Sequence, residues 1–468
     1  MSIAAAFAVP HPVICLPRVG NGEQRRISNT IDALREMGRR VAVLKPDAIV
    51  VFTPHATAYC DYIHISPGTG ASGNFAKYGD AGTVVGTAYD RPLVRAICEE
   101  AYRAHVHAGT SGEKTPELDH GTMIPLHFIH EAGEYAPIVR VSTSDLTDVE
   151  HYRLGECIAR AAKRLGRRVV VIASGDMSHR LHHSSPYGFE KEGPEFDRTM
   201  CGILASGDFG SLFTLDPRVA EHAVQCCLTP LLMMAGTLDG MIVTSDLMSY
   251  EGSVGVGYAV TEFQPLSELA VKERKFGDIY EKSEIKFRKE MRRKEDAYVT
   301  LARRAVENWA RSGAILEPDE YVTDDLPEEL TTTRAGAFVA VRKGDSPRGY
   351  MGTLEPTRET LADEIVHNAV TACSRDERFP SVTVQELPML NYWVDILGEP
   401  ELVSSVDELD PTRYGVIVST PDGRRGSVLP DEDDILSVDE QVDRACRRGG
   451  IDPQERITLQ RFEVTRHQ

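Results

Sequence analysis

The amino-acid sequence predicts an α/β domain with a mostly parallel sheet and helices on both faces, followed by a separate α+β domain. In the first half, short apolar segments alternate with helical segments of 12–18 residues, which is the pattern of β–α–β units. Beyond residue 297, short strand-like segments surround fewer helices. A chain of 468 residues is also too long for one ordinary core. We therefore expect domains at 1–264 and 297–468, joined over 265–296.

The expected elements of the first domain follow from apolar periodicity. Continuous apolar segments predict strands that are buried on both faces, and amphipathic segments predict the helices between them. Strands are expected at 4–9, 48–52, 136–141, 168–173 and 255–260, and helices at 24–38, 91–106 and 148–165.

The second half begins after a change in composition. Residues 265–296 carry many charges of both signs and few large aliphatic side chains, which favours a solvated linker or a helix. A helix is expected to start near Tyr298. Strands at 337–341, 392–396 and 416–419 and a helix at 360–374 then predict a mixed α+β domain.

Charge and cysteine usage exclude several classes of protein. From residue 297 onward there are 19 Lys and Arg against 33 Asp and Glu, within a formal net charge of −19, so a nucleic-acid partner is disfavoured. The nine cysteines form no CxxC pair, which argues against a disulfide framework or a zinc ribbon. We interpret the adjacent Cys226 and Cys227 as buried thiols. With no long apolar run and no signal peptide in the sequence, we expect no membrane span and a cytoplasmic protein.

Histidines are concentrated in the first half, where 13 of the 15 lie before residue 265. His11, His55 and His179 each follow a predicted strand, and His120 precedes an apolar stretch. Ligands bind outside the carboxyl ends of strands in such sheets. A single strand-end histidine is usually a capping residue, but the joint pattern favours a shared metal site. The other first-half histidines are assigned structural roles: His64, His105, His107, His127, His130, His151, His182, His183 and His222.

Glu251, just before the last predicted strand, is the candidate carboxylate. Alone it would more often be a surface acid. Two imidazoles with one carboxylate form the facial triad that suits non-haem Fe(II) and leaves coordination positions open. Further histidines could then transfer protons near neutral pH.

The first half resembles the class III extradiol ring-cleavage dioxygenases and the related Memo family. The matching segments are His11, Pro54-His55, the DHG–x3–PL segment that starts at Asp119, the SGDMSH block 174–179 and Glu251. The resemblance covers about residues 4–262. It implies Fe(II) held by His11, His55 and Glu251. His179 matches the acid–base histidine of the family, and His120 its substrate-facing histidine.

Memo proteins share this fold but have a cysteine near the position of the third ligand. This sequence has Glu251 there and no neighbouring cysteine, which favours the dioxygenase version. Asp176, within SGDMSH, is closer to the Memo spelling, so the chain is intermediate between the two groups.

The second half, about 297–466, resembles the AMMECR1 domain. The matching segments are RGYMGTLEP at 348–356, DERFP at 376–380 and RGSVLP at 425–430. The motif usually begins LRGCIGT. Pro347 replaces its Leu and Tyr350 its Cys, so no thiol chemistry is expected there. The resemblance implies a fold more than an activity, and the known grouping of these families suggests a radical-SAM protein as a partner.

Three hypotheses follow from these resemblances. The leading one is an Fe(II)-dependent extradiol dioxygenase that cleaves a catecholic or related aromatic with O₂. The alternative is a Memo-like metal-binding protein without ring cleavage, which acts in redox modification with a radical-SAM partner. The third is a scaffold whose AMMECR1-like domain binds another protein. Family members are commonly dimers, so the resemblance allows a homodimer, while the sequence itself does not determine the oligomeric state.

Overall fold

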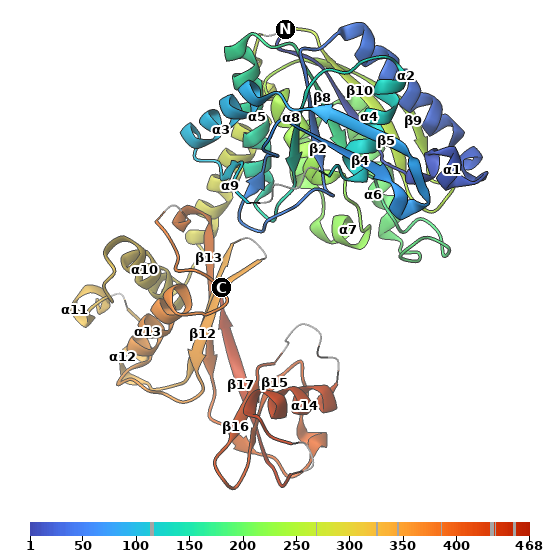
Figure 1. Cartoon of the computed structure of the whole chain (residues 1–468). Helices are drawn as coiled ribbons and strands as arrows, with labels where there is room; N and C mark the ends of the chain where they lie inside the picture. The colour runs from blue at the N-terminus through green and yellow to red at the C-terminus, as the bar shows by residue number, and fades with distance from the viewer. Residues whose placement is uncertain are drawn as a thin grey trace. The chain divides into compact units, whose positions relative to one another are not determined.

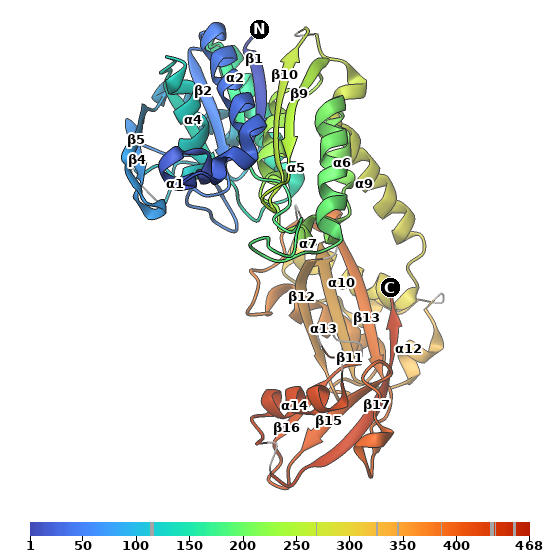
Figure 2. The same ribbon diagram turned by 90° about the vertical axis from the view of Figure 1, so that its right-hand side faces the viewer.

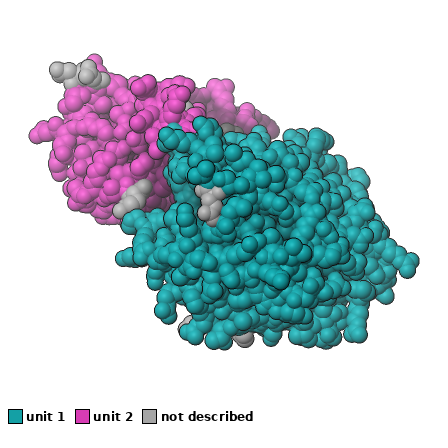
Figure 3. Space-filling view, turned by 90° about the horizontal axis from the view of Figure 1, so that it is seen from above, with its two compact units in different colours: residues 1–282 teal, residues 283–468 magenta. Residues whose placement is uncertain are grey.

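The structure is a computed structural model that describes all residues except 113–116, 268, 324–325, 344–345, 385, 431–434, 436 and 453–454. The chain forms two compact units, residues 1–282 and 283–468 (Figure 3). The division lies within the segment expected to be a charged linker or helix. Part of that segment forms α9 (Phe276–Arg292). Among the described residues, no helix is long and apolar enough to cross a membrane.

The first unit is built on a six-stranded sheet with the order β7-β2-β8-β1-β10-β9 (Figure 1). Its four parallel strands are β7 (Ile138–Ser142), β2 (Ala48–Thr53), β8 (Val169–Ser174) and β1 (Ile3–Val9). Strand β10 (Tyr258–Pro265) runs antiparallel to β1, and β9 (Val243–Glu251) runs antiparallel to β10. Every residue of β2, β7 and β8 is buried, as continuous apolar strands between two helical layers require.

Helices cover both faces of this sheet (Figure 2). One core contains residues of α3 (Arg91–Arg103), α5 (Asp148–Leu165), α6 (Glu192–Ser206) and α8 (Leu228–Thr237). The other contains residues of α2 (Ser28–Leu44) and α4 (His120–Glu131). Short elements complete the unit: α1 (Pro17–Gly20), α7 (Pro217–His222), the pair β3 (Ile63–His64) and β6 (Ala108–Gly109), and the hairpin of β4 (Gly70–Phe75) and β5 (Asp80–Ala88).

The second unit is an α+β domain with a seven-stranded sheet among the described residues. Its strands are β11 (Ala337–Lys343), β12 (Ser346–Thr353), β13 (Leu390–Leu397), β14 (Glu401–Leu402), β15 (Tyr414–Ser419), β16 (Arg425–Val428) and β17 (Thr458–His467). Helices α10 (Ala297–Ser312) and α13 (Leu361–Ser374) share a core with β11 and β13. Helix α14 (Val438–Gly449) shares a smaller core with β15 and β16. Short helices α11 (Pro318–Tyr321) and α12 (Glu328–Thr332) lie between α10 and β11.

The predicted order of an α/β domain and then an α+β domain agrees with these two units. Several elements were not predicted. Strand β9 had no assignment, and the β4–β5 hairpin was treated as loop. The β9 segment is polar and only half-buried, so it lacks the continuous apolar pattern that identified the central strands.

Candidate metal centre

Three adjacent parallel strands bring the candidate residues to one edge of the sheet. His11, His55 and Asp176 each lie two residues beyond the end of β1, β2 and β8. The register pairs Val9 with Ser174 and Phe52 with Ala173, so the three segments leave the sheet at the same level. The Nε2 atoms of His11 and His55 are 3.0 Å apart. This is the carboxyl edge where such sheets place their ligands.

The tautomer of His11 is determined by its neighbours. The Ser174 hydroxyl donates to the Gly121 carbonyl oxygen at 2.6 Å and lies 3.0 Å from His11 Nδ1. Because the hydroxyl proton is used in the first bond, Nδ1–H of His11 donates to the hydroxyl oxygen. The lone pair of His11 is therefore on Nε2, directed toward His55. A second bond from His11 N–H to the Asp176 carboxylate, at 2.8 Å, holds the loop in place.

Cys226 places a third potential metal ligand, its sulfur, beside the two histidines. His11, His55 and Cys226 form a group whose ligand atoms all lie within 4.8 Å of one another, with Cys226 Sγ 3.6 Å from His11 Nε2. The thiol is held by the backbone N–H of Asp176, which donates to Sγ at 3.2 Å. This approach needs Gly175, because a Cβ there would lie 2.4 Å from the Cα of Cys227. Cys227 is a buried thiol as expected, at 3% exposure, whereas Cys226 is half-buried and lies beside the two histidines.

Glu251, the expected third ligand, is used elsewhere. It ends β9, an edge strand separated from β1 by β10. Its carboxylate accepts from the backbone N–H of Thr30 at 2.7 Å and from the Thr30 hydroxyl at 2.6 Å. Glu251 therefore caps the first turn of α2, where N–H groups lack partners within the helix and favour a negative charge. In this structure Glu251 lies outside the group of His11, His55 and Cys226, and the identity of the third ligand stays a prediction.

Two further histidines border the group. His120 begins α4, and its ring stacks on His55 with centroids 4.2 Å apart. Its position is set by Asp119, which caps α4 and accepts from the Thr53 hydroxyl at 2.6 Å. His179 donates Nδ1–H to the Val224 carbonyl oxygen, so in the neutral ring the lone pair lies on Nε2. That Nε2 lies 3.9 Å from Asp176 Oδ2, which is itself 3.8 Å from His11 Nε2.

Burial disfavours the charged forms of His11, His120, Asp176 and Cys226. Burial first, and then the neighbouring His55, lowers the pKa of His11 to about 3. Burial, His11 and His55 together lower the pKa of His120 to about 4. Burial raises the pKa of Asp176, and burial followed by the charge of Asp176 raises the pKa of Cys226. Neutral imidazoles are the form that binds metals, and a bound cation would deprotonate the thiol.

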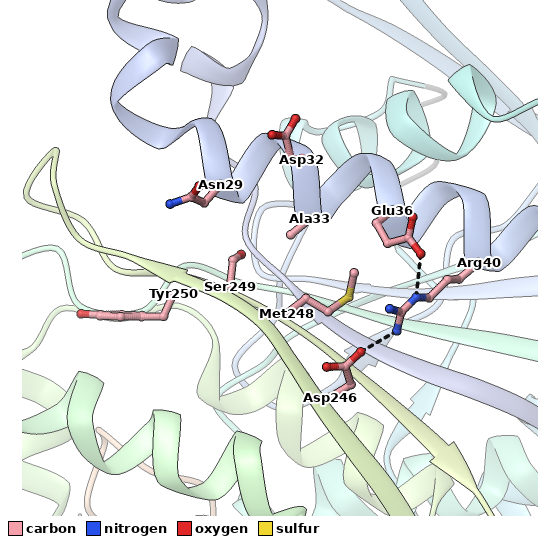
Figure 4. Close-up of a pocket in the computed structure, with 9 residues that line it drawn as sticks. All are labelled: Asn29, Asp32, Ala33, Glu36, Arg40, Asp246, Met248, Ser249 and Tyr250. Carbon is pink, nitrogen blue, oxygen red and sulfur yellow. Dashed lines mark hydrogen bonds and ion pairs between the residues drawn. The ribbon is translucent and has the colours of Figure 1, made fainter.

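A cavity of about 570 Å³ lies between α2 and β9 (Figure 4). No residue of the histidine group lines it. Its lining arginine, Arg40, is bonded to Glu36, Asp246 and Glu262. Because three carboxylates surround the Arg40 guanidinium, we assign this cavity no catalytic role.

The chain belongs to the family described as the catalytic LigB subunit of aromatic ring-opening dioxygenase, whose model matches residues 5–261. A second model, AMMECR1, matches residues 299–467. The chain is therefore a fusion of these two domains. The first domain has a dioxygenase-like fold, of a family that is typically metal-dependent.

A relative that spans the whole chain supports the fusion. Protein CA_C1420 of Clostridium acetobutylicum is 34% identical over 100% of this chain and 99% of its own. A protein of Thermotoga maritima is 45% identical over 37% of this chain and 98% of its own. The solved structure of the uncharacterised protein PH0010 of Pyrococcus horikoshii covers 36% of this chain and 88% of its own, at 25% identity and a TM-score of 0.32.

Tyr350 occupies the position of the AMMECR1 cysteine and has a structural environment. It lies on β12, and its ring stacks on Phe338 with centroids 5.4 Å apart. Its hydroxyl donates to the Asp395 carboxylate at 3.4 Å, and its backbone N–H donates to Asp376 at 2.9 Å. Arg466 also donates to Asp395. These contacts hold Tyr350 against its neighbours on the sheet.

Proposed function

We propose that the first unit is a Memo-like metal oxidoreductase in which His11, His55 and Cys226 hold a redox-active copper ion. The observation that supports this is the third donor. The Cys226 sulfur lies beside the two imidazole nitrogens. The carboxylate of Glu251, which an iron facial triad would need, caps helix α2 instead. Thiolates select Cu(I) and zinc, and a set of two histidines and one cysteine is typical of copper electron-transfer sites.

The residues present fit a metal ion. The Nε2 atoms of His11 and His55 lie 3.0 Å apart. Because Nδ1 of His11 is already used as a donor, its Nε2 carries a lone pair that a cation could accept. The Ser174 contact holds the ring of His11 in the ligating tautomer, which is the role that outer hydrogen bonds play at metal sites. When bound, copper would supply one-electron redox chemistry.

The chain's own groups would handle protons. His179 Nε2 would accept a proton from a bound substrate, because its Nδ1–H is fixed on the Val224 carbonyl oxygen. Asp176 Oδ2 lies between that nitrogen and His11, so it would orient the imidazole and stabilise its protonated form. His120, stacked on His55, would hydrogen-bond the substrate.

Ring cleavage by Fe(II) is the second candidate. It is favoured by the family match over residues 5–261 and by a basic imidazole nitrogen at His179, which ring cleavage needs to remove a phenolic proton. Its small aromatic substrate and O₂ would bind at the same carboxyl edge of the sheet.

The two candidates differ in metal and product. We expect anaerobically purified full chain to contain about one copper per chain, and to consume O₂ with catechol or hydroquinone without opening the ring. The measurements are elemental analysis and product identification after exposure to air. Iron as the bound metal, together with a ring-opened product, would reject the proposal and favour the dioxygenase.

A further inference from the structure

A second group of metal-ligand side chains lies outside the histidine centre. Glu190, Glu192 and His222 offer two carboxylate oxygens and one imidazole nitrogen, all within 4.8 Å of one another. Glu190 ends the loop that follows His179, and Glu192 begins α6. His222 ends α7, so the group joins two segments that are 30 residues apart in the sequence.

The charges of this group are only partly compensated. Arg180 pairs with Glu190 at 3.2 Å. The Glu192 side chain is only 17% exposed, and the cation beside it is the ammonium of Lys191, which is 84% exposed and 3.6 Å away. Among the described residues, no hydrogen-bond donor reaches the Glu192 carboxylate. A cation bound between two neighbouring carboxylates relieves their mutual repulsion.

We propose that Glu190, Glu192 and His222 form a second divalent-metal site, which takes a harder ion than the cysteine-containing centre. Carboxylate oxygens suit Mn²⁺, and imidazole is a common partner ligand, whereas a thiolate site selects softer metals. The three protein atoms leave room for water ligands. We assign the site a structural role, which does not depend on the function proposed for the first centre.

Its position relates it to the acid–base histidine. The residues directly after His222 contact His179: the Ala223 carbonyl oxygen accepts from His179 N–H at 3.0 Å, and the Val224 carbonyl oxygen accepts from Nδ1–H. On the other side, the loop that ends at Glu190 carries Tyr187, whose ring centroid is 6.0 Å from that of His179. A metal at the second site joins the two segments that flank His179.

The test is Mn²⁺ binding to the full chain, measured by electron paramagnetic resonance after treatment with a chelator. We expect one Mn²⁺ per chain. In Glu192→Gln and in His222→Asn, the affinity for Mn²⁺ should fall by about tenfold or more. Loss of a direct ligand should cost at least as much affinity as loss of an outer-shell partner. His222 is exposed, so the second variant tests the site without disturbing a core. The matched controls, Glu195→Gln on α6 and His11→Ala in the first centre, should bind Mn²⁺ as the wild type does.

Limited proteolysis gives an independent readout. Lys191 is exposed between the two glutamates, so bound Mn²⁺ should slow tryptic cleavage after it in the wild type and not in His222→Asn. Mn²⁺ binding that is unchanged in both ligand variants, or equally weakened in Glu195→Gln, would overturn the proposal. Binding lost only in His11→Ala would show that the ion occupies the first centre, which also overturns it.

Discussion

The chain of 468 residues with Cys226→Ser should lose most of its bound metal. The sulfur is the only thiol within 4.8 Å of both His11 and His55 among the described residues. Serine keeps the size and the hydrogen bond from Asp176 N–H but has a hydroxyl that ionises far less readily. Outer-shell partners are worth about 10–100-fold in metal affinity, so loss of a direct ligand should cost more than about 100-fold. The measurement is copper content after dialysis against a weak chelator.

Two control variants test whether the metal loss is specific to Cys226. Cys227→Ala removes the neighbouring buried thiol, and Glu251→Gln removes the carboxylate that the sequence pattern favoured. Both should retain metal. Glu251→Gln should instead lose about 1 kcal/mol of stability, because α2 loses a charged cap. A Glu251 variant that is empty and a Cys226 variant that is full would restore the iron facial triad.

His179→Gln should keep its metal and lose turnover by about 10²–10⁴-fold. The histidine is not part of the three-residue group, and its Nδ1 donates to Val224, which leaves Nε2 as the basic nitrogen. Glutamine retains a polar side chain but cannot accept a proton near neutral pH. The measurement is O₂ consumption with hydroquinone, per metal-loaded chain, together with its dependence on pH.

An exposed neighbour provides the matched control for that variant. His182→Gln, three residues further along the loop, should behave as the wild type because its side chain is exposed. Equal turnover in His179→Gln and the wild type would exclude His179 from the chemistry. Loss of metal in His179→Gln would make it a ligand or a support of the centre.

The parts of the fold that local signals determine were predicted well. Helix α5 matches residues 148–165, because Thr147 and Glu150 form a capping box and Gly166 ends the helix in the left-handed region. The edge of the sheet where His11, His55 and Asp176 converge also follows from the sequence, because buried parallel strands are continuous apolar segments and each ends two residues before a polar one.

The position of Cys226 beside His11 and His55 could not be predicted in this way, because it depends on long-range topology. Glu251 precedes a strand, but β9 is an edge strand and its end lies at α2. Cys226 comes from the loop before α8, which no periodic pattern connects to β1. The SGDMSH block at 174–179 was the available signal for a Memo-like site. Asp176 matches the Memo version of this motif, and its backbone N–H donates to the Cys226 sulfur.

The most direct measurement is X-ray absorption at the metal edge of full chain purified without added metal. We expect one sulfur scatterer at about 2.3 Å, the distance typical of a metal–thiolate bond such as Zn–S, together with nitrogen scatterers from two imidazoles. The sulfur contribution should disappear in Cys226→Ser. A spectrum of nitrogen and oxygen ligands alone in the wild type would contradict the assignment of Cys226 and return the third position to a carboxylate.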